Sequence, residues 1–190
     1  MFNFFPIIFA YFIGSFPSAF IVGKIFGSFD VRDKVTNMGL GASAIHKNIG
    51  VLAALLVFFL DAGKGVLALF LADRLSSGDH LTIVLTLVAA IIGHNWSLFL
   101  KFAGGNGAAT ICGSFFYLLP EQLFLSFAIM AAPFFAVRKK KKIFNIYKNS
   151  LFTAIVLFFT IIFSLFSGQP TLISFSPFFA LIPMWLKRSY

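Results

Sequence analysis

Long apolar runs dominate the chain and constrain its fold more than any other feature. They cover about residues 4–26, 51–72, 81–101, 122–137, 151–167 and 171–187. A helix that spans a bilayer needs about 20 such residues, or about 17 at the short end. Because 59% of the residues are hydrophobic and only 11% are charged, a water-soluble fold of this size has nowhere to bury the apolar surface. We therefore expect one all-α integral membrane domain over residues 1–190.

A further apolar helix, predicted over 107–119, decides the expected topology. Seven crossings with the N-terminus outside place 13 of the 15 Lys and Arg residues on the inner side, with only Arg74 outside and Lys64 within a span. Positive charge on short cytoplasmic loops is the strongest orientation signal. We thus predict a multi-pass protein with about seven transmembrane helices, some short or broken, and a cytoplasmic C-terminus. The first apolar run lacks a positive leader, so we expect it to be retained.

The run "RKKKK" at 138–142 has two interpretations. It is either a topology determinant on a solvated loop or a contact for anionic lipid headgroups. The single Cys112 excludes an intrachain disulfide and is expected to be a packed small residue. No cysteine cluster for a metal is present in the sequence.

Polar and glycine-rich residues interrupt the apolar runs at four places on the predicted cytoplasmic side. They are "GSFPSAFIVGKIFGSFDVR" (14–32), the polar loop 30–50, "DAGKG" (61–65) and "GHNW" (93–96). Polar groups within a span cost free energy and tend to be functional. Each also has a structural alternative: a kinked helix at Pro17, an ion pair one turn apart between Asp61 and Lys64, and a core position for His94.

The stretch "KFAGGNGAAT" (101–110) follows the fourth interruption. A glycine-rich turn that opens a helix presents bare N–H groups and the positive end of the helix dipole, which favours an anion. The position between the glycines, where a cation would help most, is the neutral Asn106. Lys101, at the membrane edge, is a candidate to supply the charge.

In this order the motifs resemble the bacterial acyl-phosphate:glycerol-3-phosphate acyltransferases, the PlsY family. The matches run from about Tyr11 to Gly113. The resemblance implies a bacterial inner-membrane enzyme whose active site lies near the cytoplasmic face. Such an enzyme moves a fatty acyl group from acyl phosphate to the 1-hydroxyl of glycerol 3-phosphate, giving lysophosphatidic acid for phospholipid synthesis. Its partners are these two substrates and the lipid bilayer, with no metal, cofactor or nucleic acid.

The resemblance also implies a role for individual residues. Those implied to be catalytic are Ser15, Arg32, Ser43 and His94. Those implied to bind substrate or phosphate are Lys47, Lys101, Gly104, Gly105, Asn106, Gly107 and Thr110. Those implied to support the site are Gly14, Asp30, Asp61 and Lys64. The guanidinium of Arg32 is a candidate phosphate clamp because it can bind two oxygens at once.

The chain departs from the family pattern at several phosphate ligands. In "TNMGLGASAIHK" (36–47), Gly39 and Ala44 replace family asparagines and Lys47 replaces an arginine. Asn106 replaces the family's lysine, and the chain ends at "MWLKRSY" without the family's basic tail. Three hypotheses therefore stay open: an active acyltransferase, a non-catalytic homologue that binds lipid or phosphate, and a small transporter built on broken helices.

Overall fold

The computed structural model describes residues 2–34, 39–137, 150–168 and 170–187. Within these ranges the chain is helical and contains no strand. In chain order the elements are α1 (Phe4–Ser15), α2 (Ser18–Gly27), α3 (Val31–Lys34), α4 (Ala42–Asn48), α5 (Val51–Ser76), α6 (His80–Asn95), η1 (Leu98–Leu100), α7 (Ala108–Leu118), α8 (Pro120–Val137), α10 (Ser150–Phe166), α11 (Thr171–Ser174) and α12 (Ser176–Leu186).

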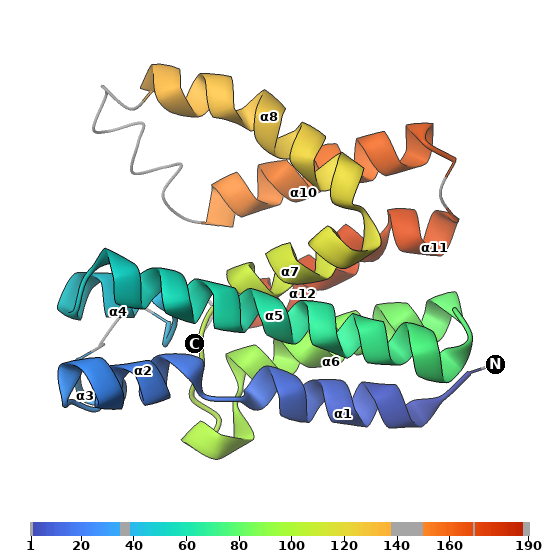
Figure 1. Cartoon of the computed structure of the whole chain (residues 1–190). Coiled ribbons are helices and arrows are strands. Elements are labelled where there is room, and N and C mark those ends of the chain that lie inside the picture. Colours follow the sequence, from blue (N-terminus) through green and yellow to red (C-terminus); the bar gives the residue numbers. More distant parts are fainter. Residues whose placement is uncertain (1, 35–38, 138–149, 169, 188–190) are drawn as a thin grey trace.

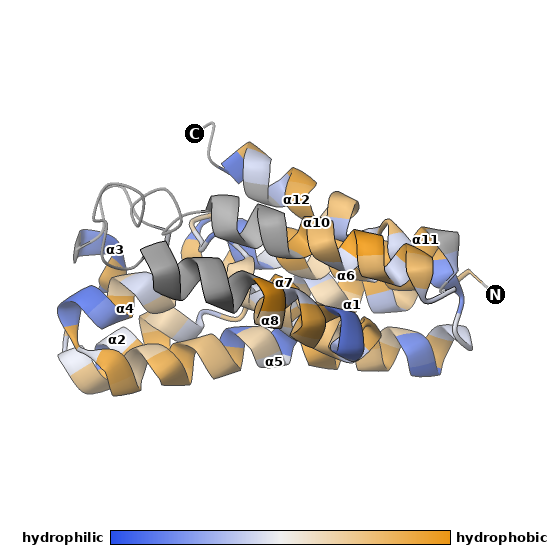
Figure 2. Cartoon of the chain, turned by 90° about the horizontal axis from the view of Figure 1, so that it is seen from above, coloured by the Kyte–Doolittle hydropathy of each residue, from blue (hydrophilic) through white to orange (hydrophobic). Residues whose placement is uncertain are grey.

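The helices form an elongated bundle (Figure 1). Helix α1 packs against α6 and α5, and α7 packs against the other side of α5. Helices α8 and α10 pair with each other, and α12 packs against α6 and α10. The short helices α2, α3 and α4 gather at the end of the bundle away from the N-terminus. Figure 2 shows hydrophobic residues along the bundle and hydrophilic ones on α3 and α4.

The apolar runs predicted from the sequence coincide with helices, and the all-α membrane fold is confirmed. Among the residues that the structure describes, three segments are long and apolar enough to cross a membrane, namely Phe4–Gly27, Val51–Ser76 and His80–Leu100. Shorter apolar helices lie at Ala108–Leu118, Leu157–Phe166 and Leu172–Pro183. The count of seven crossings and their orientation stay predictions. The basic run at 138–142 lies outside the described residues.

Two of the long apolar segments are broken, as the polar interruptions predict. Helix α1 ends at Ser15, and the next residue is extended with ψ 126°. Pro17 explains this break, because proline disfavours a helical residue before it and has no N–H of its own. Helix α6 ends at Asn95, where Trp96 leaves the helical region with φ −128° and ψ 70°. Both breaks leave main-chain groups that need partners.

In the stretch 30–50, which we expected to be a loop, the described residues 30–34 and 39–50 are partly helical. It contains the short helices α3 and α4. Helix α4 forms because Ala44 and Ile45 are buried in a cluster with Val57 of α5 and Val22 of α2. Burial of these apolar side chains outweighs the helix-breaking tendency of the neighbouring glycine residues.

Small residues let the central helices approach closely. A Cβ atom on Gly14 would collide with the carbonyl oxygen of Ala90, so α1 lies against the backbone of α6. Close helix packing through small residues is typical inside membranes, where the hydrophobic effect does not drive helices together. Gly14 therefore supports the fold at the last turn of α1, one residue before the break.

Candidate functional site

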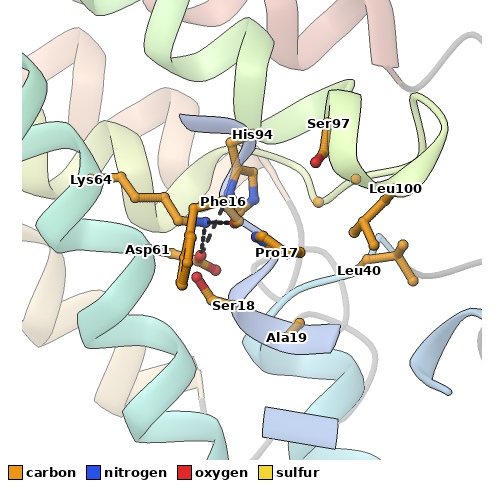
Figure 3. Close-up of a pocket in the computed structure, with 12 residues that line it drawn as sticks. Phe16, Pro17, Ser18, Ala19, Leu40, Asp61, Lys64, His94, Ser97 and Leu100 are labelled. Carbon is orange, nitrogen blue, oxygen red and sulfur yellow. Dashed lines mark hydrogen bonds and ion pairs between the residues drawn. The ribbon is translucent and has the colours of Figure 1, made fainter. Parts of the chain in front are cut away.

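A small pocket lies where the α1–α2 break meets α5, α6 and the glycine turn before α7 (Figure 3). It is open to solvent, and the empty space in and at the mouth of the pocket is about 230 Å³. It is lined by Phe16, Pro17, Ser18, Ala19, Leu40, Asp61, Lys64, His94, Ser97, Leu100, Gly104 and Gly105.

A buried charged cluster forms one wall of the pocket. Lys64 Nζ donates to Asp61 Oδ1 at 2.6 Å and to the carbonyl oxygen of Phe16 at 2.5 Å. His94 Nδ1 lies 3.7 Å from the same carboxylate oxygen, and Figure 3 shows the three side chains pointing toward one another. The Asp61 and Lys64 side chains are only 3% and 6% exposed. The predicted ion pair is confirmed, and Lys64 also satisfies a carbonyl that the helix break leaves free.

The glycine turn also lines the pocket and lies against His94. The N–H of Gly105 donates to the carbonyl oxygen of His94 at 3.1 Å, and the N–H of Leu40 donates to the carbonyl oxygen of Gly104 at 3.0 Å. A Cβ atom on Gly105 would collide with His94 Nε2, so only glycine lets the backbone pass over the imidazole. Gly107 has φ +77° and begins α7, which confirms that a glycine turn opens a helix here.

The structure brings some of the predicted site residues together and leaves others apart. Those that line the pocket are Asp61, Lys64, His94, Gly104 and Gly105. Those that are buried near it without lining it are Gly14, Ser15, Gly107 and Thr110. Those that are exposed are Arg32, Ser43, Lys47, Lys101 and Asn106. The roles assigned to all of these residues stay predictions.

Ser15 joins the two helix breaks. Its carbonyl oxygen accepts a hydrogen bond from Ser97 Oγ at 2.5 Å, and its own Oγ accepts one from the N–H of Leu98 at 3.5 Å. Ser15 is completely buried. Its contacts therefore hold the end of α1 against the segment that follows α6.

Arg32 and Asp30 form an ion pair at the exposed end of the bundle. Arg32 Nη2 lies 2.6 Å from Asp30 Oδ2, and Arg32 Nε contacts both carboxylate oxygens at 3.0 and 3.1 Å. Hydrogen bonding by the guanidinium lowers the pKa of Asp30 from 3.8 to about 2. The guanidinium also lies 5.2 Å from the centre of the Phe20 ring. These contacts fix the plane of the Arg32 guanidinium and use some of its N–H donors.

Sequence reasoning missed several residues of the pocket. Ser18 is 2% exposed, and its hydroxyl has no hydrogen-bond partner among the described residues. It comes directly after Pro17, so the helix break itself was the available signal. Ser97 follows His94 by three residues, whereas Leu40 comes from a distant segment that no local pattern connects to the pocket. Within the described ranges, no group of three His, Cys, Asp or Glu side chains gathers that could hold a metal ion.

The fold and the pocket define an integral membrane protein with a small polar site built at helix breaks. A family model described as glycerol-3-phosphate acyltransferase matches residues 4–189. A glycerol-3-phosphate acyltransferase of Prochlorococcus marinus subsp. pastoris is 33% identical over 181 residues, which are 95% of this chain and 87% of the relative. The chain belongs to the glycerol-3-phosphate acyltransferase family.

Other relatives and a solved structure agree with this membership. "Glycerol-3-phosphate acyltransferase 2" of Moorella thermoacetica is 41% identical over 65% of this chain and 62% of its own length. A crystal structure of PlsY (YgiH), described as an integral membrane glycerol 3-phosphate acyltransferase in its glycerol 3-phosphate form, matches with a TM-score of 0.79 at 26% identity. That match covers 97% of this chain and 87% of the PlsY chain. This chain spans 62% and 53% of the length of the Moorella thermoacetica and Dehalococcoides mccartyi relatives.

Proposed function

We propose that this chain transfers a fatty acyl group from acyl phosphate to the 1-hydroxyl of glycerol 3-phosphate. The products are lysophosphatidic acid, a precursor of phospholipids, and inorganic phosphate. One observation carries the proposal: in a chain of this family, three separate motifs converge on one pocket. Asp61 and Lys64 come from α5, His94 comes from α6, and Gly104 and Gly105 come from the turn before α7.

The chemistry needs little more than the groups found here. The hydroxyl oxygen of the acceptor attacks the acyl carbonyl carbon, the bond from that carbon to the phosphate oxygen breaks, and phosphate leaves with the hydroxyl proton. Acyl phosphate is an activated mixed anhydride, so the reaction needs no serine or cysteine nucleophile. The protein contributes by positioning two anionic substrates and by stabilising the carbonyl oxyanion.

The described residues offer donors for both tasks. The first turn of α7 leaves amide groups without partners inside the helix, and it follows directly on the glycine turn. His94 lies beneath Gly105 and is the titratable side chain that lines the pocket together with the ion pair. We assign it to the acceptor hydroxyl. Arg32, Lys47 and Lys101 are the exposed cations we assign to the substrate phosphates.

The proposal includes a location. We place the protein in the bacterial inner membrane with the N-terminus outside and the pocket toward the cytoplasm, because that orientation puts most of its cations inside. The helices α2, α3 and α4 would then lie at the cytoplasmic surface, where soluble glycerol 3-phosphate enters and acyl phosphate arrives from the lipid.

The direct test follows phosphate release by the purified protein in lipid vesicles, with acyl phosphate and with or without glycerol 3-phosphate. Release that depends on the acceptor supports the proposal. Binding of either substrate without turnover identifies a non-catalytic homologue, and solute flux across sealed vesicles identifies a transporter. Gly105→Ala is expected to lower turnover at least tenfold, because the added methyl group displaces the imidazole of His94. Gly63→Ala is the matched control, since its Cβ would meet no neighbour within 4 Å.

A further inference from the structure

The wall of the pocket contains a buried hydroxyl group that the fold leaves without a hydrogen bond. Ser18 is the first residue of α2 and is 2% exposed, and its Oγ has no partner among the described residues. Figure 3 shows its side chain on the side of the pocket where the Asp61 carboxylate lies. Because buried polar atoms in proteins are nearly always hydrogen-bonded, an unpaired one in a pocket wall indicates a contact for a ligand.

The backbone of Ser18 is held in place from both sides. Its N–H donates to the carbonyl oxygen of Phe16 at 3.0 Å, and Lys64 Nζ donates to the same oxygen at 2.5 Å. The next residue, Ala19, is buried in an apolar cluster that includes Val22. Rotation about a single side-chain bond therefore directs the hydroxyl of Ser18. A polar group on a fixed backbone can bind a ligand with little loss of conformational freedom.

Other polar side chains in the pocket wall already have partners, which limits the kind of group that Ser18 can meet. Ser97 Oγ donates to the carbonyl oxygen of Ser15, and Lys64 Nζ lies 2.6 Å from Asp61 Oδ1. This ion pair adds no net charge to the wall, so the wall favours a neutral polar group. A hydroxyl group both donates and accepts a hydrogen bond. The hydroxyl of Ser18 is thus matched to a hydroxyl group of a ligand.

We infer that Ser18 binds the 2-hydroxyl group of glycerol 3-phosphate and thereby selects this acceptor. The inference rests on the proposed function, in which His94 is assigned to the reacting 1-hydroxyl group. The 2-hydroxyl group is on the neighbouring carbon atom, and Ser18 and His94 line the same pocket. Ser18 is then a specificity-determining residue, because its hydrogen bond orients the acceptor and is lost with an acceptor that lacks this hydroxyl group.

The test compares Ser18→Ala and Ser18→Cys with the wild type, using two acceptors. One acceptor is glycerol 3-phosphate, and the other is 3-hydroxypropyl phosphate, which lacks the 2-hydroxyl group. The dissociation constant and kcat/KM are measured for each acceptor in folded protein. We expect both variants to weaken binding and kcat/KM for glycerol 3-phosphate by about 2- to 12-fold, the range for one neutral hydrogen bond. Both values for 3-hydroxypropyl phosphate should stay unchanged, because this acceptor does not make the bond.

Ser114→Ala is the matched control. Ser114 is a completely buried serine of α7 whose hydroxyl also has no partner among the described residues, and it does not line the pocket. It should leave the preference between the two acceptors unchanged. An unchanged preference in both Ser18 variants, or an equal loss with both acceptors, overturns the inference. If the wild type fails to transfer acyl groups, the proposed function fails, and the two dissociation constants still decide the role of Ser18.

Discussion

Replacing Lys64 by methionine tests how the buried charged cluster stabilises the fold. The substitution keeps an unbranched side chain that is one atom shorter, and it removes both hydrogen bonds, at 2.6 Å to Asp61 and at 2.5 Å to the carbonyl oxygen of Phe16. The Asp61 side chain, only 3% exposed, is then a buried carboxylate without its partner. Breaking a buried ion pair in this way costs about 3–5 kcal/mol. We expect the free energy of unfolding to fall by at least that amount, because the carbonyl of Phe16 also loses its donor.

The double variant Asp61→Leu/Lys64→Met should be less damaging than the single one. It removes both charges, and apolar replacement of a whole buried pair is often close to neutral. The carbonyl of Phe16 still loses its donor, and an unsatisfied buried group costs about 1–3 kcal/mol. Lys64→Met loses the same donor, so this cost cancels between the two variants. The double variant should therefore be more stable than Lys64→Met by about 3–5 kcal/mol, the cost of the unpaired carboxylate.

The assay is reversible unfolding in mixed micelles, followed by the fluorescence of Trp96 and Trp185. Both variants and the Asp61→Leu single variant complete a double-mutant cycle, which isolates the energy of the pair. If the double variant is as unstable as Lys64→Met, or less stable, then the unpaired carboxylate is not the source of the loss. The reasoning from a buried, neutralised pair would then be refuted.

Two further predictions concern Arg32 and Asn106, which are exposed. Arg32→Gln should raise the titration midpoint of Asp30 from about 2 toward its ordinary 3.8, as measured by NMR of the carboxyl carbon. The ion pair favours the folded state fully above about pH 4 and loses this effect as the pH falls through 2, so wild type and variant should converge in stability below that pH. An unchanged midpoint would show that the pair does not form in solution. Asn106→Lys should tighten phosphate binding by about 1.5–3 kcal/mol, which is the value of a hydrogen bond to a charged group. Unchanged phosphate affinity in folded protein would mean that the glycines serve helix packing instead.

The sequence predicts the helices well because hydropathy is a local property. Each apolar run is helical in the structure, although some runs are divided between two helices. The proline at position 17 predicted the break in the first run. The stretch 30–50 was harder, because its glycine and hydroxyl residues favour a loop while the burial of Ala44 and Ile45 requires distant neighbours. Contacts with α2 and α5 decide its structure, and no local pattern reports them. Helix α4 is therefore the part of the fold that the sequence missed.

The site shows the same division between local and distant information. Spacing alone predicted that Asp61 and Lys64 would meet, because residues three apart share a helix face. The glycine turn before α7 was equally predictable, because the glycines that form it lie in one short segment. Gly107, the last of them, has φ +77°. The contact between the Trp96 ring and Lys187 Nζ, 5.6 Å from the ring centre, joins residues about half the chain apart. It depends on where α12 docks, which hydropathy does not determine.

The helix breaks explain why some hydrogen-bond donors near this site hold the fold together and are not free to bind a ligand. Non-helical backbone inside a membrane protein is tolerated only where its polar groups find partners. Lys64, Ser97 and Tyr11 meet that requirement by donating to the carbonyl oxygens of Phe16, Ser15 and Trp96. Those donors are therefore occupied before any substrate arrives. Under the proposed function, the substrate phosphates therefore depend on other donors, which we assign to the amide groups at the start of α7 and to the exposed Lys47 and Lys101.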